Sequence, residues 1–145
     1  MNRLAVIVPW GNPRRISSLA DLENPGISVV LCDPTQPCGK YAAQMLAGAG
    51  VSITPRSLEA SASGVVARVR SGEADAGISY VSDTVTAEGV GTVAIPISRN
   101  VTATYPIGVA KSPSSGSPSD ARRFVDFVMS KVGQAILKSA GFITR

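Results

Sequence analysis

The most informative run of the chain is VRSGEADAGISYVSD, residues 69–83. It indicates the end of a helix, a glycine stop, a tight turn and a short strand with a polar end. Gly72 can adopt the left-handed conformation that closes a helix. Residues 76–80 are mostly apolar, which is typical of a short strand covered on both faces. Tyr80 is therefore expected near the carboxyl end of a strand, where α/β proteins bind their ligands.

Strands and helices are expected to alternate on both sides of this run. Hydrophobic patterning predicts strands at residues 4–9, 28–32, 57–59, 76–80, 92–97 and 103–110. It predicts helices at residues 17–22, 39–47, 62–69 and 82–88, then one that opens at Ser117-Pro118 and another at 132–140. A serine is expected to cap the first of these helices. The alternation predicts an α/β fold with a parallel sheet.

Length and charge limit the classes of function. The chain has 145 residues, enough for one domain with a real core. Its net charge of +4 comes from scattered residues, without a basic run interleaved with aromatics, so nucleic-acid binding is not supported. A mild positive field suits an anionic small ligand, although a solvated surface also explains most of these charges. The chain contains no run of eighteen or more apolar residues, so no membrane span is predicted.

The side chains available for catalysis are few. The chain has no histidine, which removes Ser-His-Asp and Cys-His catalysis and the usual zinc sites. Four carboxylates are expected near the carboxyl edge of the sheet: Asp33, Glu59, Asp75 and Asp83. None of them forms a clear pair with a nucleophile, so an enzyme is not favoured.

The two cysteines, Cys32 and Cys38, are six positions apart with two prolines between them. Because the prolines fold the loop back, a disulfide is sterically possible. Two free, buried thiols are the alternative. Redox chemistry is a third interpretation, but the spacing is not Cys-x-x-Cys.

Three places could hold an anion. The first is the turn at Cys38 and Gly39, which runs into a helix whose first amides lack acceptors. The second is the small-residue stretch 59–63, which leads into the next helix. The third is Tyr80, whose hydroxyl can donate a hydrogen bond. Each alone is also explained as a helix cap or a core tyrosine, but all three follow strands and are expected at one edge of the sheet.

The same segments resemble a known family. PCGKYA (37–42), EASAS (59–63) and the run from Gly72 to Asp83 resemble the periplasmic molybdate-binding proteins of bacterial ABC transporters. The ending, with YPIGV (105–109), FVDF (124–127) and QAIL (134–137), is similar too. The resemblance covers nearly the whole chain. It implies a type II periplasmic-binding-protein fold: an αβα lobe of three layers with a mostly parallel sheet, plus C-terminal helices of the other lobe.

The resemblance also implies a site. The backbone amides of Cys38 and Ala62 and the hydroxyl of Tyr80 would bind molybdate or tungstate as an oxyanion, with no metal or other cofactor. Gly39, Ser61 and Ser63 would support them. The family usually has alanine at Cys38 and valine at Ala62, and both changes are tolerable if only the amides matter. An extracytoplasmic location favours the Cys32–Cys38 disulfide.

The resemblance further implies how the chain is divided. Residues 1–106 would form the second ligand-binding lobe with its crossover strands, and residues 107–145 would return to the first lobe. We expect the N-terminal portion of the family, with its signal, to be lacking here. The face from Phe124 to Val128 would then be exposed and invite dimerisation or segment exchange. In full-length form the protein would work with a membrane permease, in the periplasm or as a cell-surface lipoprotein.

Two alternatives stay open. One is a binding protein for another oxyanion, such as sulfate or phosphate, because amide and hydroxyl donors recognise oxygen geometry and not the central atom. The other is a LysR-like effector-sensing domain, although the sequence shows no helix-turn-helix.

Overall fold

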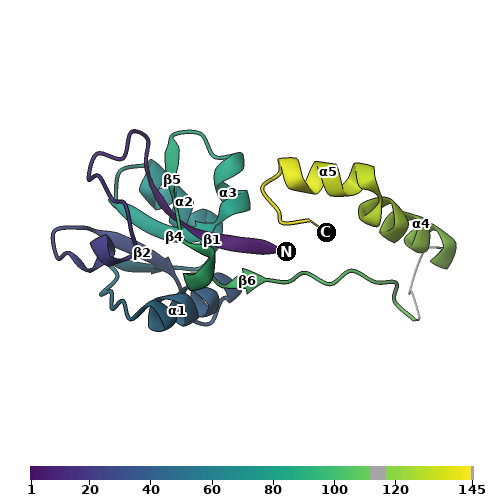
Figure 1. Ribbon diagram of the computed structural model, residues 1–145, viewed down its shortest axis with the longest axis horizontal. Helices are drawn as coiled ribbons and strands as arrows, with labels where there is room; N and C mark the ends of the chain where they lie inside the picture. The colour runs from purple at the N-terminus through teal and green to yellow at the C-terminus, as the bar shows by residue number, and fades with distance from the viewer. Residues whose placement is uncertain (112–116, 145) are drawn as a thin grey trace.

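The structure is a computed structural model that describes residues 1–111 and 117–144. Figure 1 shows a body of sheet and helices and, apart from it, a pair of helices reached through an extended segment. The strands are β1 (Asn2–Pro9), β2 (Val29–Cys32), β3 (Ser57–Glu59), β4 (Ala76–Tyr80), β5 (Val90–Ala94) and β6 (Thr102–Ala103). The helices are η1 (Ala20–Glu23), α1 (Pro37–Ala49), α2 (Ala62–Arg70), α3 (Val81–Val85), η2 (Ile97–Arg99), α4 (Pro118–Met129) and α5 (Lys131–Ser139), where η marks a 3₁₀ helix.

One sheet organises the body, with the strand order β3-β2-β4-β1-β5 and with β6 beside the start of β1. Strand β2 pairs in parallel with β3 and β4, whereas β1 is antiparallel to β4, β5 and β6. All strands except β1 therefore run in one direction, as the expected mostly parallel sheet requires. The carboxyl ends of β2, β3 and β4 share one edge, which brings the three predicted anion-binding segments to the same side.

Hydrophobic side chains pack on both faces of the sheet. Because side chains alternate along a strand, Leu4, Val6 and Val8 of β1 face one layer and Ile7 faces the other. The first layer is covered by α1, through Ala42, Met45 and Leu46. The second is covered by α2, through Val65, Val66 and Val69. The three-layer αβα arrangement is confirmed.

Gly72 follows α2 as the sequence predicted, with φ 77° in the left-handed region. The helix predicted at residues 39–47 is longer at both ends, because α1 runs from Pro37 through Gly48 to Ala49 and is closed by the left-handed Gly50, with φ 69°. The helix predicted at residues 17–22 is instead the 3₁₀ helix η1, and the predicted serine cap is wrong. The carboxylate of Asp21 accepts the N–H groups of Ser17 and Ser18 at 2.7 and 2.9 Å, so the acid makes the turn and the serines donate to it.

Two predicted elements are shorter than expected. The strand predicted at residues 103–110 is confined to β6, and residues 104–110 have no regular structure. Pro106 has no N–H to donate to a neighbour, and β1 ends its own pairing with β6 at Asn2. The helix predicted at 82–88 ends at Val85, before the left-handed Gly89.

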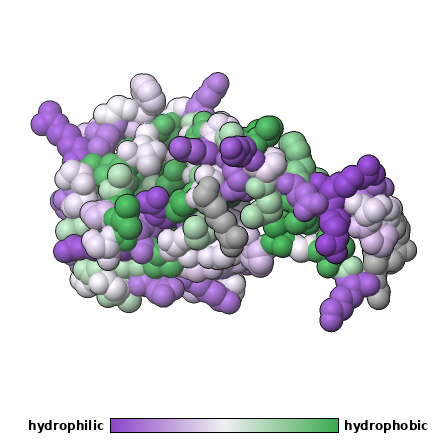
Figure 2. All heavy atoms as spheres, turned by 45° about the vertical axis from the view of Figure 1, so that its right-hand side comes forward, coloured by the Kyte–Doolittle hydropathy of each residue, from purple (hydrophilic) through white to green (hydrophobic). Residues whose placement is uncertain are grey.

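Helices α4 and α5 follow each other end to end, and the segment after α5 meets the body near the N-terminus (Figure 1). The amide of Ile143 donates to the carbonyl of Met1 at 2.8 Å, and the N-terminal amine donates to the carbonyl of Ile143 at 3.0 Å. Figure 2 shows hydrophobic side chains gathered on this helix pair. Phe124, Val132 and Ile136 are 62, 62 and 55% exposed. The division into lobes at residue 106 stays a prediction. Within the described residues, no helix is long and apolar enough to cross a bilayer.

Candidate anion-binding site

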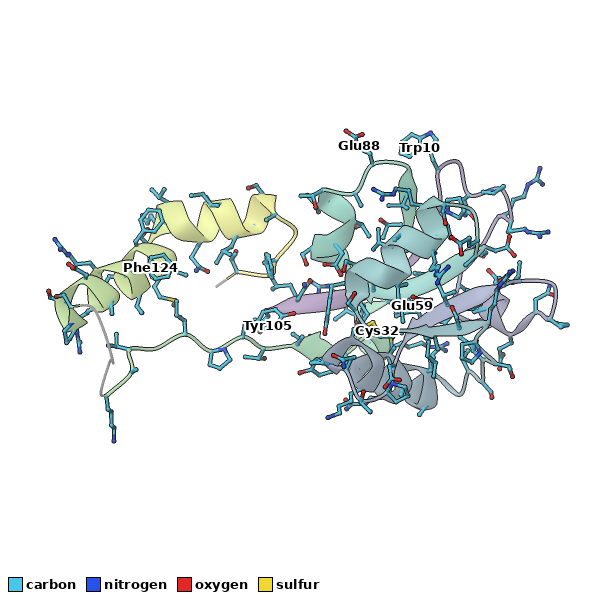
Figure 3. The ribbon with its side chains drawn as sticks, turned by 180° about the vertical axis from the view of Figure 1, so that it is seen from behind. Trp10, Cys32, Glu59, Glu88, Tyr105 and Phe124 are labelled. Atoms are coloured by element: carbon cyan, nitrogen blue, oxygen red, sulfur yellow. A yellow bond between two sulfur atoms is a disulfide. The ribbon has the colours of Figure 1, made fainter. Side chains whose placement is uncertain are left out.

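The carboxyl ends of three neighbouring strands meet at one edge of the sheet. Cys32 of β2 pairs in register with Glu59 of β3, and the amide of Asp33 donates to the carbonyl of Glu59 at 2.8 Å. Figure 3 shows Cys32 and Glu59 side by side in the body. On the other side of β2, the hydroxyl of Ser79 near the end of β4 lies 3.4 Å from the carbonyl oxygen of Ala62, the first residue of α2. The starts of α1 and α2 and the end of β4 are thereby brought together.

The start of α1 is fixed tightly against the end of β2. Cys38 is joined to Cys32 by a disulfide, with 5.8 Å between the Cα atoms, and both residues are buried. A Cβ atom on Gly39 would lie 2.1 Å from the carbonyl oxygen of Asp33 and 2.7 Å from that of Cys32. Gly39 is one of the residues expected to support the ligand contacts. In the structure the close approach is to the chain's own backbone.

Free amides point out of both helix starts. The N–H groups of Cys38 and Gly39 have no acceptor within the described ranges, and the first hydrogen bond of the helix runs from Lys40 to the carbonyl of Gln36. In α2 the N–H groups of Ala62 and Ser63 likewise have no acceptor there. Because the dipole of each helix adds positive potential at its start, these amides suit an anion.

Ser61 and Ser63, which were predicted to support the site, stabilise the start of α2. The hydroxyl of Ser61 accepts the N–H of Gly64 at 3.1 Å and so caps the helix. The hydroxyl of Ser63 lies 3.0 Å from that of Ser61. These two side chains satisfy each other and the cap, while the amides of Ala62 and Ser63 stay open.

Tyr80 ends β4 and is partly buried. Burial is the main cause that raises the pKa of Tyr80 to about 12, and the neighbouring phenols of Tyr105 and Tyr41 act in the same direction. The carboxylate of Asp83 adds to the effect. The hydroxyl therefore keeps its proton at neutral pH and can donate a hydrogen bond.

One hydrophobic cluster gathers the three predicted contact residues. Ala62 and Tyr80 pack against the cluster to which Cys38 belongs. The groups predicted to contact a ligand are hydrogen-bond donors: two pairs of backbone amides and the hydroxyl of one phenol. Such a set can bind an oxyanion without proton transfer, and within the described residues no group of three acidic, cysteine or histidine side chains could hold a metal.

One carboxylate lies elsewhere than expected. Asp75 directly precedes β4, so it lies at the amino edge, where its carboxylate accepts the N–H of Ser28 at 2.8 Å and pairs with Arg14 at 2.8 Å. It lines a groove of about 510 Å³ at that edge. The expectation that it lies beside the site is wrong, because a residue before a strand and a residue after it are at opposite edges.

Sequence reasoning missed two residues near the site, Ser79 and Tyr105. Ser79 is fully buried and bonds to Asp83, which was expected at this edge, and Tyr105 lies beside Tyr80. A polar residue inside the otherwise apolar strand 76–80 was a signal for Ser79. Nothing in the sequence placed Tyr105 next to Tyr80, because its proximity depends on the path of the chain after β6.

The disulfide is expected to stabilise the folded protein. Replacing both Cys32 and Cys38 with alanine should lower the free energy of unfolding by about 2 kcal/mol, since the bond closes only a short loop in the unfolded chain. Urea unfolding of the variant and the parent measures this difference. Two free thiols in the unreduced parent, found by mass spectrometry, would contradict the pairing.

The sequence model of the family described as bacterial extracellular solute-binding protein matches residues 1–143. The chain belongs to this family. Solute binding is thus the role by which the family is described.

Individual solute-binding proteins are similar over the whole chain. The molybdate-binding protein ModA of Mycobacterium tuberculosis is 39% identical over 142 residues, which are 97% of this chain and 54% of ModA. The chain thus spans about half the length of the curated relatives it matches. The fold matches the Azotobacter vinelandii periplasmic molybdate-binding protein, with a TM-score of 0.68, 16% identity and coverage of 99% of this chain and 66% of that one. It also matches the sulfate-binding protein SubI of M. tuberculosis, with a TM-score of 0.73, 19% identity and coverage of 99 and 56%.

Proposed function

We propose that the chain binds a tetrahedral oxyanion, molybdate or tungstate, as part of the solute-binding component of an ABC importer. One observation supports this proposal most directly. The starts of α1 and α2, with their free amides, lie at the same sheet edge as the hydroxyl of Tyr80. The amides of Cys38 and Ala62 and this hydroxyl are the proposed contacts, supported by Gly39, Ser61 and Ser63. The 39% identity to a molybdate-binding protein supports this ligand over others.

The wider context of the proposal follows from the family. Residues 1–106 serve as one ligand-binding lobe with its crossover strands, and residues 107–145 belong with a second lobe. The protein works outside the cytoplasm and delivers its ligand to a membrane permease, and it needs no cofactor. An extracellular solute-binding family and a disulfide beside the site support this location.

Sulfate is the second candidate. A donor-only site accepts any fully ionised tetrahedral oxyanion of suitable size, and the fold is also that of a sulfate-binding protein. Isothermal titration of the intact gene product that contains residues 1–145 separates the candidates, with molybdate, tungstate, sulfate and phosphate as ligands. Molybdate and tungstate should bind at least tenfold more tightly than sulfate. Tighter binding of sulfate would replace the first proposal by the second, and no binding of any of the four would refute both.

Binding should be independent of pH around neutrality. The chain has no histidine, and the raised pKa of Tyr80, about 12, keeps its hydroxyl protonated. A group with a raised pKa loses its proton only as the pH climbs toward that value, so the molybdate affinity should be constant from about pH 6 to about pH 9. Calorimetry across this range tests the expectation. A steep change, or a need for added divalent metal, would contradict a donor-only site.

The chain by itself should self-associate. Phe124, Phe127, Val132 and Ile136, all on the helix pair α4–α5, are at least half exposed. Apolar side chains gathered in this way favour contact with a second copy. Light scattering of residues 1–145 should find a dimer or larger species, and the double variant Phe124→Ser, Val132→Ser should shift it toward monomer. A parent that stays monomeric at high concentration would refute this expectation.

A further inference from the structure

We propose that Asp83 is a positioning residue of the oxyanion site, which holds the end of β4 through the hydroxyl of Ser79 and the amide of Tyr80. The inference rests on the proposed function, because it concerns how one of the proposed ligand donors, the hydroxyl of Tyr80, is kept in place. Asp83 does not contact the ligand and acts through Tyr80, which does.

Ser79 is the first link. Its side chain is fully buried, and a buried hydroxyl must find a hydrogen-bond partner. Its oxygen lies 2.6 Å from a carboxylate oxygen of Asp83 and 3.4 Å from the carbonyl oxygen of Ala62. The single proton goes to the carboxylate, since a charge-assisted bond of that length is the stronger one. The hydroxyl of Ser79 is thus tied to the first turn of α3, which joins the end of β4 to the helix that follows it.

The second link is the backbone of Tyr80. The same carboxylate oxygen of Asp83 that accepts from Ser79 also accepts the N–H of Tyr80, at 3.2 Å. Asp83 is in the first turn of α3, so it ties the last residue of β4 to the helix that follows. The direction in which the tyrosine side chain leaves the strand is thereby fixed.

The negative charge of Asp83 does not itself favour an oxyanion nearby. A carboxylate has no proton to donate to an oxyanion, and its negative charge repels one. Its presence beside the site therefore weakens binding unless the positions it enforces compensate. The charge of Asp83 and the geometry that it enforces can be separated by substitution.

Three variants and one control separate them, with molybdate as the probe in calorimetry of the intact gene product. Asp83→Ala removes both charge and hydrogen bonds and should weaken binding at least tenfold. Asp83→Asn keeps an oxygen acceptor and removes the repulsion, so it should bind at least as tightly as the parent. Ser79→Ala should weaken binding three- to tenfold. The control Asp21→Ala removes a carboxylate with the same pattern, bound to a serine hydroxyl and amides, but far from the site at η1, and should leave the affinity unchanged.

A double-mutant cycle tests whether Asp83 acts through Tyr80. If it positions the phenol, Asp83→Ala should cost at least threefold less in a Tyr80→Phe background than in the parent, because the hydroxyl is already gone. If Asp83→Ala weakened binding only through a general loss of stability, it would weaken binding by the same factor in the Tyr80→Phe background as in the parent. If Asp83→Ala does not fold, Ser79→Ala in the same cycle carries the test.

The outcomes are distinct. Parent-like binding by Asp83→Ala, weak binding by Asp83→Asn, or multiplying effects in the cycle would overturn the positioning role while leaving the oxyanion site in place. An Asp21→Ala variant that weakens binding as much as Asp83→Ala would overturn it too. If the parent binds none of the four oxyanions, the proposed function fails, and the positioning role fails with it.

Discussion

Replacing Gly39 with alanine is expected to destabilise the protein by about 3 kcal/mol, at the upper end of what overpacking usually costs. An added Cβ would lie 2.1 Å from the carbonyl oxygen of Asp33 and 2.5 Å from its carbon, and both are backbone atoms that cannot rotate away. Either α1 moves off the end of β2 or the strand end distorts. The disulfide from Cys38 to Cys32 opposes the first movement.

The same helix supplies the control for this prediction. A Cβ on Gly48 would meet no atom within 4 Å. Gly48→Ala should therefore stabilise the protein by about 0.5–1 kcal/mol, because alanine is the better helix former. Urea unfolding of the two variants and the parent measures both changes. A Gly39→Ala variant with the unfolding midpoint of the parent would show that α1 does not need this contact.

The second large effect is expected at Tyr80. Tyr80→Phe should weaken molybdate binding by about 1.5–3 kcal/mol, since a hydrogen bond to a charged ligand is lost. That is roughly ten- to a hundredfold or somewhat more in the dissociation constant. The aromatic ring stays, so its packing against α2 and the unfolding midpoint of the protein should change little.

Tyr41→Phe is the matched control for this substitution. Tyr41 is on α1 and contributes to the environment of Tyr80, but it is not among the proposed contacts. Calorimetry should give this variant the affinity of the parent. Equal affinities of Tyr80→Phe and the parent would mean that the hydroxyl of Tyr80 serves the core and not a ligand.

Local sequence signals located most of the fold. Hydrophobic spacing found α1 and α2, and the left-handed Gly72 follows α2 where the sequence predicted a glycine stop. The reason is that helix ends depend on backbone freedom, which the residue type controls directly. The sheet edge that gathers the site could also be predicted, because parallel strands connected by helices must place their carboxyl ends on one side.

Long-range contacts decided what the sequence could not. The antiparallel direction of β1, the hydrogen bond from Ser79 to Asp83 and the closeness of Tyr105 to Tyr80 join residues whose neighbours are chosen by packing. Residues 104–110 have a strand-like pattern but form no strand, because no neighbouring strand pairs with them.

The division between the two sources is clearest at Gly39. The sequence by itself determined that a helix starts here with free amides, because proline and glycine precede a helical pattern. Only the tertiary structure decided why the residue must be glycine: the carbonyl groups of Cys32 and Asp33 occupy the space of its side chain. Residue type restricts the local backbone directly, whereas occupied space depends on which distant strand the helix start is packed against.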